Sequence, residues 1–168
     1  CLSGDFDPDL MIATIDKYFG ALRPNDNLPK LHFTPEEPMT QPVITEVLGP
    51  ESPSINLGWR LAGAASKDVE LVNLLSQVLY NGKAGLLDLN INQQQKLLAC
   101  YGYFYALADH SILLIQARPK EGQTLEDAKA IIMSEIEKLK SGNFDESLLT
   151  ATINNFKRYQ MELLEDND

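Results

Sequence analysis

A proline-rich stretch divides this chain and limits what it can fold into. Proline lacks a backbone N–H and its ring fixes φ, so closely spaced prolines exclude a helix or a central strand. We therefore predict that residues 23–42 form an extended linker, stiffer than a Gly/Ser linker, with a domain boundary inside it. The five prolines of this stretch are Pro24, Pro29, Pro35, Pro38 and Pro42.

Residues 1–22, before the linker, have the pattern of the end of a strand followed by a helix. Asp7 is a suitable N-cap, and Pro8 is favoured at the first helical position. Apolar residues then recur at helical spacing from Met11 to Tyr18. A lone strand and helix cannot bury both of their faces, so we predict that this segment is the tail of a preceding domain.

Residues 43–168, after the linker, alternate between strand and helix periodicity. Strands are predicted at 43–48 and 54–61, joined as a hairpin, and Ser66 is predicted to cap the helix that follows. The remaining predicted elements are a short helix from Gly85 towards Gln95, strands at 97–105 and 110–118, and two helices capped by Thr124 and Asp145. This order predicts an α+β fold, a two-layer domain with an antiparallel sheet and paired helices packed on one face.

The charge of the chain excludes several classes of partner. Fourteen basic residues stand against 24 acidic ones, which gives a formal net charge of −10. Binding to nucleic acid or to an anionic membrane surface needs a positive patch, and the basic residues here are scattered. No apolar stretch approaches the roughly 20 residues that a membrane span requires. We expect no nucleic acid partner and no membrane span, and we attribute the acidity to solubility.

The residues that most often carry catalysis or bind metal are few and badly spaced. His32 and His110 are the two histidines, and neither has a second ligand at the helical spacing of a zinc site. Cys100 lies in an apolar run, which favours a small core residue over a nucleophile. We therefore predict no catalytic residue, no metal ligand and no cofactor within this chain.

Four aromatic residues gather on the strand predicted at 97–105. Tyr101, Tyr103, Phe104 and Tyr105 surround Gly102. Tyrosine offers a large contact area and glycine permits close approach of another backbone, so this strand is a candidate recognition surface. The alternative is that the rings pack under the terminal helices or against a neighbouring domain, and the sequence favours that alternative.

Several segments together resemble the insulinase/pitrilysin-like zinc peptidase family. Residues 4–9 and 18–20 look like the strand and helix that end the catalytic domain in that family. The segments 55–61, 80–87 and 120–122 find counterparts, in order and spacing, in the zinc-free domain that follows it. The resemblance covers nearly the whole chain, and it implies the two-layer domain of insulinase and the processing peptidases.

The resemblance also implies what is missing from this chain. The active site of the family is an H-x-x-E-H zinc motif with a further glutamate downstream, and this sequence contains no such motif. No catalytic or zinc-binding residue is therefore carried over. By resemblance, residues 1–22 end a catalytic-type domain, zinc is expected in the upstream part of that domain, and residues 43–168 are most of the zinc-free domain. The implied partners are a peptide substrate and the other domains of the parent peptidase.

Some members of the family hold the substrate on an exposed strand of the zinc-free domain, close to a glycine-rich turn. By resemblance, the candidates are Gly82 and Gly85 in the turn and Tyr101, Gly102 and Tyr103 on the strand. The peptide would add to the sheet as a further strand. Two alternatives remain: a purely structural or assembly domain of a proteolytically inactive relative, and an independent hydrolase with a site of another kind.

Overall fold

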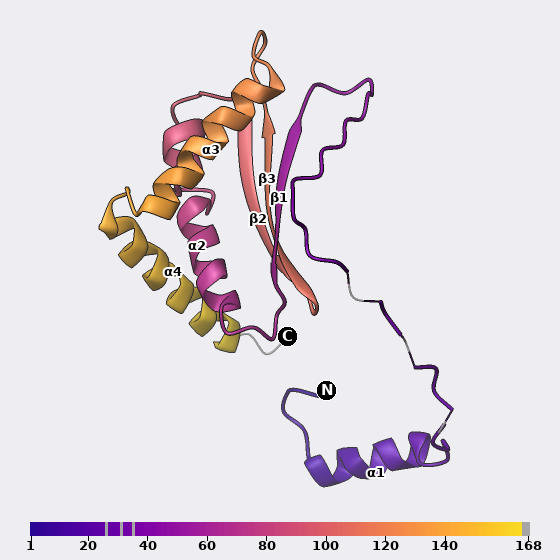
Figure 1. Cartoon of the computed structure of the whole chain (residues 1–168). Coiled ribbons are helices and arrows are strands. Elements are labelled where there is room, and N and C mark those ends of the chain that lie inside the picture. Colours follow the sequence, from indigo (N-terminus) through magenta and orange to yellow (C-terminus); the bar gives the residue numbers. More distant parts are fainter. Residues whose placement is uncertain (26, 31, 35, 166–168) are drawn as a thin grey trace. The chain divides into compact units, whose positions relative to one another are not determined.

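The computed structural model describes residues 1–25, 27–30, 32–34 and 36–165 (Figure 1). Pro35 of the predicted linker and the last three residues of the chain lie outside the described residues. The chain divides into two compact units at the peptide bond between Gly49 and Pro50.

The described residues of the N-terminal unit form one helix, α1, at Pro8–Phe19. Its N-cap is Asp7, as predicted, whose Oδ1 accepts hydrogen bonds from the N–H groups of Asp9 and Leu10 at 2.9 and 3.1 Å. Residues 1–6 form no strand, contrary to the prediction. The side chains of α1 include no buried residue.

The strand predicted at 43–48 is wrong. These residues are extended but unpaired, and the exposed fractions of Val47 and Leu48 are 86% and 101%. The β-branched and apolar residues of this segment favour a strand. A strand also needs a second backbone to pair with its N–H and C=O groups, and composition does not supply one.

Three strands in the described part of the chain form one antiparallel sheet in the order β1-β3-β2. They are β1 at Ile55–Ala62, β2 at Ala99–Ala106 and β3 at His110–Arg118. The predicted hairpin between 43–48 and 54–61 is therefore wrong, because β1 pairs with β3 instead, with Leu57 opposite Ile115. Strand β2 pairs with the other side of β3, with Tyr103 opposite Leu114.

Helices cover one face of this sheet (Figure 1). They are α2 at Val69–Leu79, the π-helix η1 at Asp88–Asn92, α3 at Leu125–Ser141 and α4 at Glu146–Glu165. The result is the predicted α+β architecture, with an antiparallel sheet and its helices on one side. No helix among the described residues is long and apolar enough to cross a membrane.

The helix ends follow local signals in α3 but not in α2. Thr124 and Asp127 form the predicted capping box at the start of α3, and Gly142 ends the helix with φ of 67°. Ser66, by contrast, does not cap α2. Its Oγ accepts from the N–H of Asp68 at 3.2 Å in a turn that precedes the helix, and Asp68 occupies the N-cap position.

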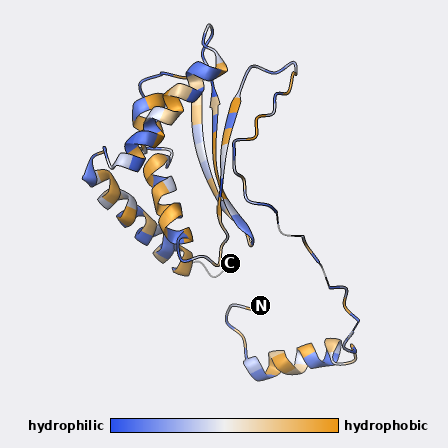
Figure 2. Cartoon of the chain, viewed as in Figure 1, coloured by the Kyte–Doolittle hydropathy of each residue, from blue (hydrophilic) through white to orange (hydrophobic). Residues whose placement is uncertain are grey.

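The core lies between the helical layer and the sheet. Figure 2 shows α2 as mostly hydrophobic along its length, since it packs between the sheet and the other two long helices. Cys100 is buried in this core, as its apolar surroundings in the sequence predicted. The fully buried members from the sheet and helices include Val78, Leu79, Leu87, Ile91, Cys100, Ile115 and Ile132.

Candidate functional site

The tyrosines of β2 lie on the face of the sheet that the helices leave open. Side chains alternate between the two faces of a strand, and Cys100 points into the core. Tyr101, Tyr103 and Tyr105 therefore point away from the helices, with exposed fractions of 42%, 39% and 48%. The rings of Tyr103 and Tyr105 stack with centroids 6.3 Å apart. Packing under the terminal helices is therefore wrong for these three rings, because the helices cover the opposite face, and packing against a neighbouring domain stays a prediction.

Two of the candidate glycines meet at Tyr80, the residue after α2. A Cβ on Gly102 would lie 2.7 Å from the Cβ of Tyr80, and a Cβ on Gly85 would lie 2.7 Å from the Cα of Tyr80. The Tyr80 ring also meets the Tyr101 ring edge to face, with centroids 6.2 Å apart. The fold thus brings the turn and the strand together through a residue that the sequence did not single out.

Gly82 has a different role from Gly85. Its φ is +76°, and no described atom lies within 4 Å of the position of a Cβ. Gly82 lets the chain turn in the left-handed region, which other residues rarely adopt, whereas Gly85 is required by close packing. Tyr103, the last candidate, lies one residue beyond Gly102 on the open face.

A buried carboxylate organises the turn between α2 and η1. One oxygen of Asp88 accepts from the N–H groups of Asn81 and Gly85 at 3.1 and 3.0 Å, and Asp88 is 5% exposed. Burial, with a smaller contribution from the Asp88 charge, raises the pKa of Tyr80 above its ordinary value. In the sequence, an aspartate inside the apolar run from Leu86 to Leu89 was the available signal for this role.

Asn92 occupies one end of the outer edge of β2. Asn92, the last residue of η1, accepts from the Cys100 N–H at 2.9 Å and donates to the Cys100 carbonyl at 2.7 Å. No other described strand pairs with this edge. Beyond Cys100 the strand therefore presents an edge without a paired strand among the described residues, which we call the open edge, beside the tyrosine face.

The described residues offer no metal centre, since no group of three His, Cys, Asp or Glu side chains among them could hold an ion. His32 is exposed and His110 begins β3 half-buried. Burial and, to a smaller extent, Asp88 raise the pKa of the Cys100 thiol to about 12, so this cysteine stays protonated and is a poor nucleophile.

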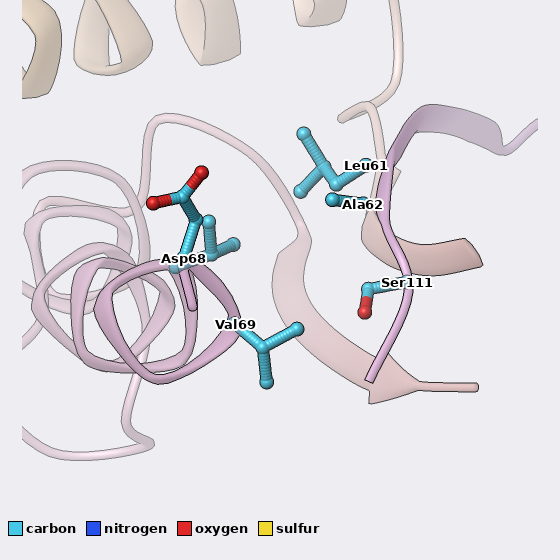
Figure 3. Close-up of a pocket in the computed structure, with 6 residues that line it drawn as sticks. Leu61, Ala62, Asp68, Val69 and Ser111 are labelled. Atoms are coloured by element: carbon cyan, nitrogen blue, oxygen red, sulfur yellow. The ribbon is translucent and has the colours of Figure 1, made fainter. Parts of the chain in front are cut away.

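A small hollow lies at the opposite end of β2 from Cys100. Its volume is about 150 Å³, and it opens between the start of α2 and the ends of β1 and β3 (Figure 3). The Oγ of Ser111 is buried and has no hydrogen-bond partner in the described part of the chain. Apart from that hydroxyl and one carboxylate the lining is aliphatic, formed by Leu61, Ala62, Asp68, Val69, Val72 and Ser111.

Comparisons with known proteins agree with the fold. A search of curated protein sequences gave no match. The chain is similar to the crystal structure of a protease from Helicobacter pylori, with a TM-score of 0.79, 22% identity, and coverage of 98% of this chain and 41% of that chain. It is also similar to the "inactive peptidase domain of a putative zinc protease" from Bordetella parapertussis, with a TM-score of 0.58, 17% identity, and coverage of 67% and 62%.

This chain therefore spans less than two thirds of either of these proteins, and at these identities the likeness shows the fold alone. The sequence profile of the peptidase M16 inactive domain matches residues 1–156. The resemblance to the zinc-free peptidase domain is confirmed by this match. Because the match covers most of the chain, the chain belongs to the peptidase M16 inactive-domain family.

Proposed function

We propose that this chain is the zinc-free part of a zinc metalloendopeptidase and helps to enclose and position its peptide substrate. Membership of an inactive peptidase domain family supports a role without catalysis. The observation that carries the proposal is the open edge of β2, which lies beside exposed tyrosines. An exposed strand edge with adjoining aromatic rings suits the binding of an extended peptide.

The proposed mode of binding is addition of the peptide to the sheet as a further strand. The backbone of β2 would supply hydrogen bonds, and Tyr101 and Tyr103 would contact side chains of the peptide. Gly82 and Gly85 would shape the neighbouring turn. Gly102 also has a packing role, because the space that its side chain would occupy is filled by Tyr80.

We propose that zinc binds in the upstream domain of the parent protein and not in this chain. The described residues of this chain do not fit a zinc site, since they include no suitable group of three ligands. Catalysis by zinc would therefore take place in the upstream domain that the family resemblance implies. No step of the reaction is assigned to residues of this chain.

The exposed apolar side chains of α1 support the proposal that another domain packs against this helix. Ile15 and Tyr18, three residues apart on one face of α1, are exposed by 42% and 68%. Apolar side chains that share one face of a helix are normally buried against a neighbour. Residues 1–22 would be the end of a preceding catalytic-type domain, and residues 23–42 the linker to the zinc-free domain at 43–168.

The test replaces both Tyr101 and Tyr103 by alanine in the full-length protein and follows cleavage of a fluorogenic peptide. We expect KM to rise roughly three- to thirtyfold with little change in kcat, because the rings hold the peptide without touching the reacting bond. Tyr159→Ala, which removes an exposed tyrosine from α4, is the matched control and should leave KM unchanged. An unchanged KM in the double variant would defeat the anchoring role.

The alternative is a structural or assembly role in a relative without proteolytic activity. The exposed apolar residues of α1 fit this role equally well, since an assembly interface would also cover them. The alternative requires that the full-length protein cleaves no peptide. An intact H-x-x-E-H motif in the upstream sequence, together with measured cleavage, would exclude it.

A further inference from the structure

Asn92 imitates a neighbouring strand at one position of β2. Its side-chain amide donates to the Cys100 carbonyl at 2.7 Å and accepts from the Cys100 N–H at 2.9 Å. These are the two hydrogen bonds that a residue of an added antiparallel strand would make with Cys100. The hydrogen-bonding position beside Cys100 is thus already filled.

The contact with Cys100 fixes which residues of β2 face the open edge. Alternate residues of a strand direct their N–H and C=O groups to opposite sides. Since the groups of Cys100 point to Asn92, those of Gly102 and Phe104 point to the same edge, and those of Tyr101 and Tyr103 point to β3. Strand β2 includes Ala106 as its last residue, so a docked strand can pair with Gly102, Phe104 and Ala106 but not with Cys100.

The position of Asn92 is held by contacts that do not involve β2. Asn90, in the same π-helix, donates to Oε2 of Glu135 in α3 at 2.7 Å, and Glu135 is 1% exposed. Beyond Asn92, the N–H of Lys96 donates to the Ile91 carbonyl at 2.9 Å. π-Helices are rare and occur frequently at functional sites. The bonds to Cys100 are therefore additional to those that anchor η1.

We propose that Asn92 is a positioning residue that sets the register of a peptide docked on β2. The inference rests on the proposed function, because it concerns the same edge. One end of the paired segment of the peptide would lie at Asn92, and pairing would extend from Gly102 through Phe104 towards Ala106. The ligand is an extended peptide with unsubstituted amides, and proline is excluded where the peptide N–H must donate to Gly102 or Phe104.

Side chains of the peptide would alternate between two surfaces. Residues opposite Tyr101, Tyr103 and Tyr105 would lie on the tyrosine face, and those opposite Gly102 and Phe104 would lie towards the helices, where Tyr80 is half-buried. A shift of the peptide by one residue would exchange these two sets of side chains. The block at Asn92 prevents a shift towards Cys100 and so favours one placement of the side chains on the two surfaces.

The experiment uses the ¹⁵N-labelled 168-residue chain and measures hydrogen exchange of single backbone amides by NMR. The probe is an acetylated and amidated octapeptide of alternating threonine and valine with a lysine at each end. In the wild type, the probe should slow exchange at Gly102 and Phe104 by about tenfold or more and leave Cys100 unchanged, because Asn92 already protects that amide.

In Asn92→Ala, the Cys100 amide should exchange faster without the probe and become protected when the probe is added. Gln94→Ala is the matched control, since it shortens an exposed amide side chain two residues beyond Asn92, and it should behave as the wild type. Asn92→Ser has a side chain too short to make both hydrogen bonds to Cys100, so it should respond to the probe as the alanine variant does, and it serves if that variant does not fold.

The outcomes separate the two proposals. Protection at Gly102 and Phe104, with no response of Cys100 to the probe in Asn92→Ala, would overturn the register role and leave docking on the edge intact. Protection of Cys100 by the probe in Asn92→Ala alone supports the register role. Absence of any response along β2 in the wild type would overturn edge docking and, with it, the register role.

Discussion

Tyr80 is the residue on which the candidate site depends most. It lies between two backbones that both carry glycine, at Gly85 and at Gly102. Each glycine lets a strand or turn approach the tyrosine more closely than any other residue would allow. The position of Tyr80 beside the exposed tyrosines of β2 therefore depends on glycine at both positions.

Gly102→Ala should destabilise the domain. The added Cβ would lie 2.7 Å from the Cβ of Tyr80, and relief requires movement of a backbone rather than of a flexible chain end. We expect a loss of about 1–3 kcal/mol in the free energy of unfolding, measured by urea denaturation. Gly58→Ala in β1 is the control, because no described atom lies within 4 Å of its Cβ. Equal stabilities of the two variants would contradict the close packing at Tyr80.

The thiol of Cys100 should make stability depend on pH in the alkaline range. Burial raises its pKa from 9.0 to about 12. Between these values the unfolded chain loses the thiol proton and the folded chain keeps it, so the free energy of unfolding should fall as pH rises. Cys100→Ala should show a shallower fall. In the native wild type at pH 8, a thiol reagent should modify the exposed Cys1 and leave Cys100 unmodified.

At the scale of the elements, the structures predicted correctly are those with local signals. The strand at 110–118 has the predicted bounds, because a long apolar run ends at a proline. The capping box at Thr124 needs only residues three apart. The predicted strand at 43–48 has equally good composition, but a strand exists only if a second backbone pairs with it, and composition carries no information about that.

In the candidate site, too, features set by local sequence were predicted and features set by contacts across the fold were not. Alternation along β2 predicted that Tyr101 and Tyr103 share a face, and the structure agrees. The roles of Tyr80, Asp88 and Asn92 were missed because each depends on a contact made by the fold. Asn92 reaches a backbone eight residues away through a turn, and η1 is a π-helix, which the helical period of the sequence does not distinguish from an ordinary helix.

Asp88→Ala should loosen the turn between α2 and η1. The change leaves the N–H groups of Asn81 and Gly85 without their acceptor in a mostly buried place. We expect a loss of about 2 kcal/mol in the free energy of unfolding and faster hydrogen exchange at both amides. Asp68→Ala is the control, since that N-cap side chain makes no capping hydrogen bond in the described residues. A loss of similar size in both variants would mean that the turn does not depend on Asp88.

At the scale of the whole chain, the two compact units differ in how much they bury. Every buried hydrophobic side chain of the described residues lies between Val69 and Leu148, within the unit at 50–165. In the N-terminal unit α1 buries nothing, and the extended segment 43–48 is exposed. Because burial of apolar surface dominates stability, residues 50–165 should carry nearly all of it.

Limited proteolysis should therefore remove the N-terminal unit and leave the second. Endoproteinase Glu-C, which cuts after glutamate, has exposed sites at Glu46 and Glu51 on either side of the boundary, and mass spectrometry should find a persistent fragment that begins just after one of them. Residues 50–165, expressed separately, should unfold within about 3 °C of the full chain. A much lower midpoint would mean that the N-terminal unit covers apolar surface of its neighbour. The exposed side chains of α1 would then have their partner within this chain, and the support that they give to a preceding domain would disappear.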